Sequence, residues 1–306
     1  MRVLAFVLVS FLAAQAPQQS PQPRATFSSH SDLAVVHVAV LDRHSGYVGG
    51  LPRDAFTILE DGHPQPISLF ENEDTPVTVG LVIDSSQSMA PRRDAVIAAG
   101  MAFAESSHPG DEMFTINFNE HVWPGLSDGQ PFTRDHAELR EALLRSGARG
   151  RTALFDALST ALKHLDDGNE ARKVLIVVSD GGDNASGTAF ASVLDGALRR
   201  DVVIYAIGLA DRDDDGARPA VLRKLAEVTG GEAFFPKSNE QIGPALQRIA
   251  RDIRSAYTLG YVPGSGQGGE GPRRIRVEVQ NADGRKLAVR ARTLVLAPGG
   301  QPGGEQ

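Results

Sequence analysis

Three short apolar runs constrain the fold of this 306-residue chain more than any other feature of its sequence. The runs are "VGLVI" at 79–83, "VLIVV" at 174–178 and "VVIYAI" at 202–207. They are continuously apolar and rich in β-branched residues, which is typical of strands that are buried on both faces. A sheet built from such strands needs helices on both of its sides.

Helical patterns alternate with these runs between residues 76 and 254. The helical patterns are "RRDAVIAAGMAFAESS", "DHAELREALLRSG", "ALFDALSTALKHL", "FASVLDGALRR", "PAVLRKLAEVTG" and "QIGPALQRIARDIRS". Two further strand candidates are "EMFTINFN" and "EAFFP". This alternation predicts an α/β fold over residues 76–254: a doubly wound, mostly parallel sheet that is flanked by helices.

The segments before and after this region have the pattern of β-strands. Residues 32–75 contain "DLAVVHVAVLD" and then "AFTILEDGHPQPISLF", which indicates two strands joined by a turn at Asp61-Gly62. Residues 255–296 predict three strands, in "AYTLGYVP", "RRIRVEVQ" and "RKLAVRARTLVL". Isolated hairpins are marginally stable. We therefore expect the N- and C-terminal segments to form one small β domain, with the α/β domain inserted between them.

The N-terminus has the features of an export signal. Residues 1–16, "MRVLAFVLVSFLAAQA", combine one arginine, a short apolar stretch and a terminal Ala-Gln-Ala, as secretory signal peptides do. An ordinary buried strand or helix is the alternative. No run of the mature chain is apolar enough for a transmembrane helix. Residues 17–31 predict a polar linker and residues 297–306 a disordered tail. We therefore expect a secreted or periplasmic protein.

Composition excludes several classes of function. The formal net charge of −7 argues against a general nucleic-acid-binding protein. Cysteine is absent, which excludes disulfides, thiol nucleophiles and thiolate zinc sites. The lack of cysteine remains compatible with export, because a chain of this length buries a large core without disulfides.

Oxygen-bearing side chains follow two of the apolar runs, at the edge where ligands bind in open α/β sheets. Asp84 follows "VGLVI", Asp180 follows "VLIVVS", and Thr152 lies near the start of a predicted helix. The segment "DSSQS" adds Ser86 and Ser88. Carboxylate and hydroxyl oxygens suit a hard cation such as Mg²⁺, Ca²⁺ or Mn²⁺ better than zinc or copper.

Each of these residues also has a local explanation. Asp84 could cap the next helix, with residues 85–88 forming a polar turn. Asp180 with its two following glycines could be only a turn, and Thr152 only a helix start. Ser88 could also cap the helix that follows it. Their joint occurrence on one predicted sheet edge favours a metal site.

Other polar segments are weaker candidates. The segment "DRDDDG" at 211–216 lacks the closing glutamate of an EF-hand loop and reads as a solvated acidic loop. Asp183 and Asn184 could orient the waters of a ligand, although a turn is the simpler interpretation. His121 is expected near the sheet edge, but none of the histidines has metal-ligand spacing.

The segments "DSSQS", "GRTALFDAL" and "SDGGDN" together resemble the von Willebrand factor type A (VWFA) domain family. The family pattern is D-x-S-x-S, then a distant threonine, then a distant aspartate that is commonly followed by glycine, and all five positions match. The flanking β segments look like those of a bacterial, exported subfamily. The resemblance implies a VWFA/Rossmann-like fold and a metal-ion-dependent adhesion site (MIDAS) that binds Mg²⁺, Mn²⁺ or Ca²⁺.

The resemblance also implies roles for the residues. Ser86, Ser88 and Thr152 would bind the metal directly, and Asp84 and Asp180 directly or through water. An acidic residue of a partner protein would complete the coordination. We therefore expect an exported adhesion or assembly module that is not an enzyme.

Two alternatives of other classes remain. The first is a Mg²⁺-dependent phosphoryl-transfer or hydrolytic enzyme, although the sequence has no P-loop and no G-x-S-x-G elbow. The second is a structural protein whose metal site stays empty. In some relatives the last helix of the domain moves when the metal changes ligand. Here the last helix runs straight into the strand "AYTLGYVP", so a shift would reach the β domain.

Overall fold

The computed structural model describes residues 33–44, 46–72, 74–145, 147–209, 216–263, 272–281 and 285–296. The predicted signal peptide, the polar linker, the C-terminal tail and most of the acidic segment 211–216 lie outside the described residues. In the ranges given above, no helix has the length and apolar character needed to cross a membrane.

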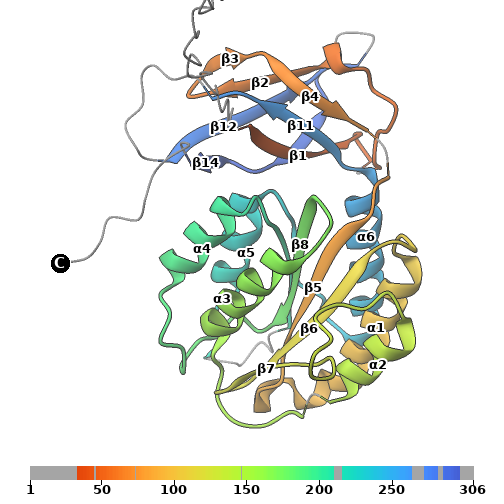
Figure 1. Ribbon diagram of the computed structural model, residues 1–306, viewed down its shortest axis with the longest axis vertical. Helices are drawn as coiled ribbons and strands as arrows, with labels where there is room; N and C mark the ends of the chain where they lie inside the picture. Colours follow the sequence, from red (N-terminus) through yellow and green to blue (C-terminus); the bar gives the residue numbers. More distant parts are fainter. Residues whose placement is uncertain are drawn as a thin grey trace, which may run out of the picture. The chain divides into compact units, whose positions relative to one another are not determined.

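A six-stranded sheet forms the centre of the α/β region, in the order β10-β9-β8-β5-β6-β7. Figure 1 shows β8, β5, β6 and β7 of this sheet. Its strands are β5 (Val77–Asp84), β6 (Glu112–Phe118), β7 (Val122–Pro124), β8 (Arg172–Ser179), β9 (Val203–Gly208) and β10 (Ala233–Phe234). Only β7 is antiparallel to its neighbour, and the other pairs are parallel. Every residue of β5 and β9 is buried. These findings confirm the predicted mostly parallel sheet.

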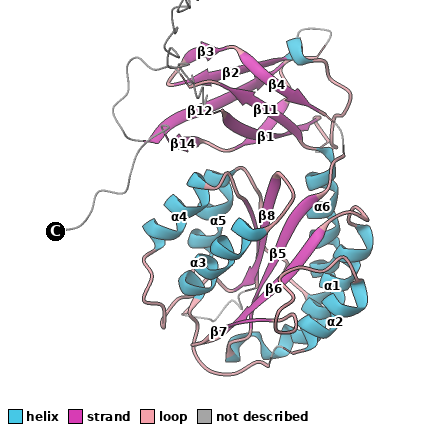
Figure 2. Ribbon diagram, viewed as in Figure 1, coloured by secondary structure: helices cyan, strands magenta, loops and turns pink. Residues whose placement is uncertain are grey.

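Helices cover both faces of this sheet (Figure 2). One face packs against α1 (Arg93–Ser106), α2 (His136–Leu144) and α6 (Ile242–Ser255), and the other against α3 (Leu154–His164), α4 (Phe190–Arg199) and α5 (Pro219–Thr229). The described residues also contain the 3-10 helices η1 (Arg53–Ala55), η2 (Gln87–Arg92), η3 (Leu165–Asp167) and η4 (Asn239–Gln241). Neighbouring side chains of β5 alternate between the two cores, with Leu81 in the first and Val82 in the second. The six helices predicted from the sequence are confirmed.

The remaining strands form two four-stranded sheets, with the orders β13-β1-β11-β4 and β14-β12-β2-β3. They are β1 (Ala34–Leu41), β2 (Phe56–Glu60), β3 (His63–Gln65), β4 (Ile67–Glu71), β11 (Tyr257–Tyr261), β12 (Pro272–Val279), β13 (Ala288–Ala291) and β14 (Leu294–Leu296). N-terminal strands pair with C-terminal ones, β1 with β11 and β13, and β2 with β12. Apolar side chains of both sheets form a third core. The small β domain formed by both terminal segments is therefore confirmed as part of the fold.

Two details of this β region differ from the prediction. The turn at Asp61-Gly62 is present, with φ of 48° and 86° as a type I′ hairpin requires, and it joins β2 to β3. The segment predicted to hold two strands contains a third, β4. Likewise, "RKLAVRARTLVL" forms two strands, β13 and β14, which belong to different sheets. The guanidinium of Arg292, between them, donates to the carbonyls of Val35 and Leu198. Alternating polarity predicts burial, whereas it does not show where one strand passes from one sheet to another.

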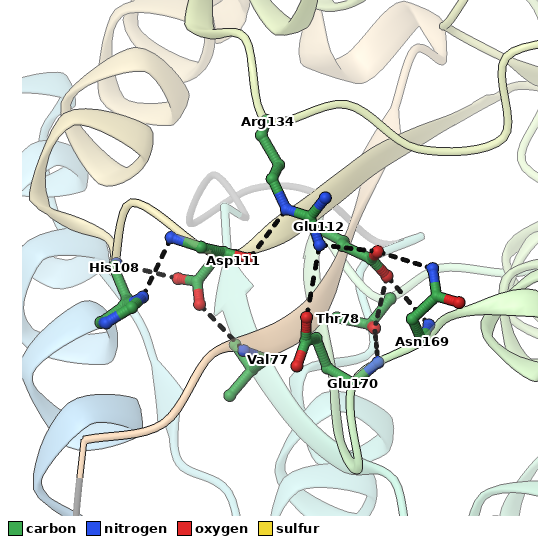
Figure 3. A network of polar contacts seen from close by, with 9 residues as sticks. Val77, Thr78, His108, Asp111, Glu112, Arg134, Asn169 and Glu170 are labelled. Carbon is green, nitrogen blue, oxygen red and sulfur yellow. Dashed lines mark hydrogen bonds and ion pairs between the residues drawn. The ribbon is translucent and has the colours of Figure 1, made fainter.

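A polar network fixes the amino ends of β5 and β6, at the opposite end of these strands from the candidate site (Figure 3). Asp111 accepts a hydrogen bond from the Val77 amide at 2.9 Å. The buried carboxylate of Glu112 forms an ion pair with Arg134 at 2.9 Å. It also accepts from the amide and the side chain of Asn169, at 2.9 and 2.7 Å. Glu112 also accepts from the hydroxyl of Thr78 in β5 at 3.3 Å, so its carboxylate connects the two strands to the segment of Asn169.

Candidate metal site

Asp84 ends β5 and is held between two strands. Its side chain is 3% exposed. Oδ1 accepts from the Ser86 amide at 2.9 Å, and Oδ2 accepts from the hydroxyl of Ser179 at 2.6 Å. Ser179 is the last residue of β8, which is the parallel neighbour of β5, so the carboxyl ends of the two strands lie together. The Asp84 carboxylate is therefore fixed at the edge of the sheet.

A chain of contacts joins Asp84 to Asp180. The hydroxyl of Ser86 is 3.1 Å from that of Ser88, and Ser88 donates to Oδ2 of Asp180 at 2.7 Å. Oδ1 of Asp180 accepts from the Gly182 amide at 2.8 Å. Ser88 lies inside η2, and α1 begins only at Arg93, so the prediction that Ser88 caps the following helix is wrong. Its hydroxyl is directed to Asp180 instead.

Thr152 reaches the same region through its backbone. Its amide donates to Oδ1 of Asn184 at 2.9 Å, and its carbonyl accepts from the amides of Asn184 and Ala185 at 2.9 and 3.0 Å. Thr152 is 6% exposed and lies two residues before the start of α3. The structure thus places Thr152 beside the loop that follows Asp180.

Burial raises the pKa of Asp84 to about 6. Hydrogen bonds from Ser179 and Ser86 act in the opposite direction, and the nearby carboxylate of Asp180 raises the pKa further. Two carboxylates in a water-poor environment repel one another, and a divalent cation between them removes that repulsion. The oxygen-only donor set also fits a hard cation. The residues present therefore fit the metal that the sequence pattern implies.

The five candidate ligands differ from a metal site that is built mainly of charged or imidazole side chains. In the described part of the chain, no group of three or more His, Cys, Asp or Glu side chains could hold a metal ion. A site of the predicted type has only two carboxylates, and its remaining oxygens come from hydroxyl groups.

Two residues at this edge have contacts that the sequence did not predict. Ser179 supports the Asp84 carboxylate, and the only signal for it is a hydroxyl at the end of an otherwise apolar run. Asn184 forms hydrogen bonds to both the amide and the carbonyl of Thr152. His121 is exposed just after β6, where its amide donates to Oδ1 of Asn119.

Comparison with known proteins matches part of the chain to a family model. A sequence model of the von Willebrand factor type A domain matches residues 79–182, a range that includes all five candidate ligands. Among curated proteins, no sequence matches the chain significantly.

Solved structures with TM-scores above 0.5 share the fold. The von Willebrand factor type A protein from Catenulispora acidiphila is 15% identical with a TM-score of 0.52, over 86% of this chain and 73% of that chain. Proximal thread matrix protein 1 from the mussel byssus is 17% identical with a TM-score of 0.52, over 64% of this chain and 51% of that chain. The same mussel protein with a zinc-occupied MIDAS motif is 15% identical with a TM-score of 0.49, over 65% and 50%.

At such identities the likeness to solved structures concerns the fold alone. The sequence match covers residues 79–182, and the parallel sheet with helices on both faces agrees with it. The α/β region, which contains the matched residues 79–182, has the fold of the von Willebrand factor type A domain.

Proposed function

We propose that this chain is an exported protein-binding module of the adhesion or assembly kind. Its MIDAS-type site would hold Mg²⁺, Mn²⁺ or Ca²⁺ and, through the metal, an acidic residue of a partner protein. One observation carries the proposal: the 2.7 Å hydrogen bond from Ser88 to Asp180, two residues that are 92 positions apart. It brings "DSSQS" and "SDGG" to one edge of the sheet.

The proposed ligands divide by charge. The hydroxyl oxygens of Ser86, Ser88 and Thr152 would bind the cation directly, and the carboxylates of Asp84 and Asp180 directly or through water. Mg²⁺ is seldom fully enclosed by protein ligands and keeps several waters. A cation with few anionic ligands retains an attraction for one more carboxylate, which is what the bound metal would supply to a partner.

The proposal assigns binding, and no chemical step, to this site. Phosphoryl transfer at a Mg²⁺ site needs groups that hold the phosphates and position the nucleophile. The residue two positions after Asp84 is Ser86, so the sequence lacks the second aspartate of the common Asp-x-Asp phosphotransferase arrangement. Turnover of phosphate esters that is lost in Asp84→Ala would favour the enzyme instead.

Export is the sequence-based part of the proposal, and it depends on residues 1–16. We propose that they act as a signal peptide that directs the chain to the periplasm or the medium. Expression of the full chain with a C-terminal tag, followed by intact-mass analysis of the periplasmic and medium fractions, tests this. A chain that keeps residues 1–16 and stays in the cytosol would contradict it.

Metal titration tests the site itself. We expect the chain to bind one Mn²⁺ in isothermal titration calorimetry, and Thr152→Ala to weaken that binding at least ~10-fold at an unchanged melting temperature. Thr160→Ala is the matched control, because Thr160 lies on α3 and its hydroxyl donates to the carbonyl of Asp156. The control should bind Mn²⁺ like the wild type.

The same variants test partner binding. We expect immobilised wild type and Thr160→Ala to retain a protein from the native envelope fraction in Mn²⁺ and to release it in EDTA. Thr152→Ala should not retain it. Retention that is independent of both the metal and Thr152 would refute the proposed role of the site.

A further inference from the structure

The first turn of α3 lacks a local cap. Its N-cap residue is Ala153, whose side chain makes no cap hydrogen bond. The first amides of a helix have no partner within the helix and need acceptors from elsewhere. Here Oδ1 of Asp183 accepts from the Phe155 amide at 3.3 Å, and the hydroxyl of Ser186 accepts from the Asp156 amide at 3.1 Å. The cap of α3 therefore comes from the loop that follows β8.

The helix in turn supplies an acceptor to that loop. The carboxylate of Asp156 accepts from the amides of Gly187 and Thr188, at 3.0 and 2.8 Å. Hydrogen bonds hold the pKa of Asp156 below its usual value, chiefly the one from the Thr188 side chain and to a smaller extent those from these two amides. Within the loop, the hydroxyl of Ser186 donates to Oδ1 of Asp183 at 2.6 Å. The start of α3 and residues 183–188 thus form one hydrogen-bonded unit.

The unit extends to the candidate ligand Thr152. Asn184 makes two bonds to it: its Oδ1 accepts from the Thr152 amide at 2.9 Å, and its own amide donates to the Thr152 carbonyl at 2.9 Å. Ala185 donates to the same carbonyl at 3.0 Å. The Ala153 amide, next along the chain, donates to the carbonyl of Asn119 at 2.7 Å. The backbone around Thr152 is therefore held by the loop on one side and by the end of β6 on the other.

These hydrogen bonds bear on the relative placement of Asp180 and Thr152. Asp180 is fixed by β8, whereas Thr152 lies in a segment between α2 and α3 that belongs to no strand. A metal site needs its ligands held to within about half an ångström. Residues 183–188 begin three positions after Asp180 and bind the segment of Thr152, so they connect the two candidate ligands directly.

We propose that Asp183 and Asn184 are positioning residues of the metal site, and that they set the place of Thr152 relative to Asp180. The inference rests on the proposed function, because it assumes that the five oxygens bind a cation. Asn184 acts directly on Thr152, and Asp183 acts through the first turn of α3. Neither side chain is a metal ligand.

Two substitutions of Asn184 test the proposal, one that removes the contact with Thr152 and a conservative one that should restore it. Asn184→Ala removes the acceptor for the Thr152 amide and leaves the bond from the amide of residue 184 in place, so the segment loosens while the fold is kept. Asn184→Asp retains an acceptor oxygen at the same position. Loss of a group that orients a metal ligand typically costs 10- to 100-fold in affinity.

Mn²⁺ titration of the full chain measures the effect. We expect Asn184→Ala to bind Mn²⁺ about 10-fold more weakly than the wild type, and Asn184→Asp to bind within about 3-fold of it. Asn281→Ala is the matched control, because Oδ1 of Asn281 also accepts a backbone amide, that of Arg285, at 2.8 Å. Its affinity should equal that of the wild type.

Hydrogen exchange gives a readout that needs no metal. In chelator, the amides of Thr152 and Phe155 should exchange faster in Asn184→Ala than in the wild type, and those of β8 should not change. A wild type that binds Mn²⁺ together with an Asn184→Ala variant that binds it equally well would overturn this inference and leave the metal site standing. Weakened binding that Asn184→Asp fails to restore would also overturn it. A wild type that binds no Mn²⁺ would refute both proposals.

Discussion

The hydroxyl of Ser88 and the carboxylate of Asp180 are 2.7 Å apart, although 92 positions of the chain separate the two residues. Ser88 lies in η2, just beyond β5, and Asp180 follows β8. These strands are parallel neighbours, so the contact is a direct consequence of the strand order. It also allows an experiment, because Ser88 is exposed and its substitution leaves the apolar cores unchanged.

Ser88→Ala should therefore weaken metal binding at a limited cost in stability. We expect the affinity for Mn²⁺ to fall about 10-fold, while the free energy of unfolding in chelator falls by no more than about 1.5–3 kcal/mol, the cost of one hydrogen bond to a charged group. Calorimetric titration and urea unfolding measure the two quantities. Ser192→Ala, at an exposed serine of α4, is the control and should change neither. Unchanged Mn²⁺ affinity in Ser88→Ala would count against this ligand.

A buried ion pair in the β region should dominate stability there. Oε1 of Glu60 accepts from Arg273 at 2.6 Å, and its Oε2 accepts from the hydroxyl of Tyr261 at 2.6 Å. All three residues are less than 9% exposed. Arg273→Met leaves the carboxylate buried without its cation, which costs about 3–5 kcal/mol. Tyr261→Phe removes one hydrogen bond to a charged group and should cost about 1.5–3 kcal/mol.

Urea unfolding of the two variants gives the order of these costs. The double variant Glu60→Leu/Arg273→Met removes both charges and should recover part of the loss of Arg273→Met. A larger cost for Tyr261→Phe than for Arg273→Met would contradict the importance of the ion pair.

Two glycines form a matched pair for the effect of an added methyl group. A Cβ at Gly231 would lie 2.1 Å from the carbonyl oxygen of Ile204, which is backbone of β9 and cannot rotate away. Gly231→Ala should therefore lower the free energy of unfolding by about 1–3 kcal/mol. At Gly243, in the first turn of α6, a Cβ meets nothing within 4 Å, and Gly243→Ala should stabilise the fold by about 0.5–1 kcal/mol. Thermal and urea unfolding should show opposite signs for the two.

His37 should make stability depend on pH. It lies in β1, partly buried, with Nδ1 3.2 Å from the hydroxyl of Thr258 in β11. Burial, and then the charges of Arg172 in β8 and of Arg292, lower its pKa to about 3. The unfolded imidazole titrates near pH 6.5, so the unfolded chain binds more protons between these values. The free energy of unfolding should therefore fall as the pH falls from 7 towards 3.

The size of this effect follows from linkage. Between pH 7 and pH 5, His37 should account for a loss of up to about 2 kcal/mol. His37→Gln has no titrating group, so its stability should decline less than that of the wild type over the same interval. Urea unfolding at both pH values measures the difference. Equal declines in the two proteins would show that His37 does not carry the effect.

Continuous apolar runs were the strongest predictors of the fold. Strands such as β5 and β8 are buried on both faces, and that burial is visible in the sequence without any tertiary information. The edge strand β7 was not predicted, because it has only three residues, one of which is Pro124. The division of one predicted strand at Arg292 was also missed, since its cause is hydrogen bonding to Val35 and Leu198, which are distant in sequence.

The sequence predicted those residues of the candidate site that stand out by their type and position. Asp84 and Asp180 were visible because each ends an apolar run, where a polar side chain must face the sheet edge. The part played by Asn184 was not, because a side chain that accepts from the Thr152 amide looks like any turn residue until both segments are placed. Ser179 is a similar case, since only the neighbouring strand shows what its hydroxyl contacts.

The antiparallel pairing of β4 with β11 has a consequence for how the polypeptide is made. Glu71 lies opposite Thr258, so the chain leaves the β region and returns to it through adjacent strands. The whole α/β region is thus an insertion between β4 and β11. A short connection between these two strands could replace it while their pairing stays intact. During synthesis the order is less favourable. His37 is made 221 residues before Thr258, so β1 has to await its partner strands β11 and β13, whereas β2 can pair at once with β3.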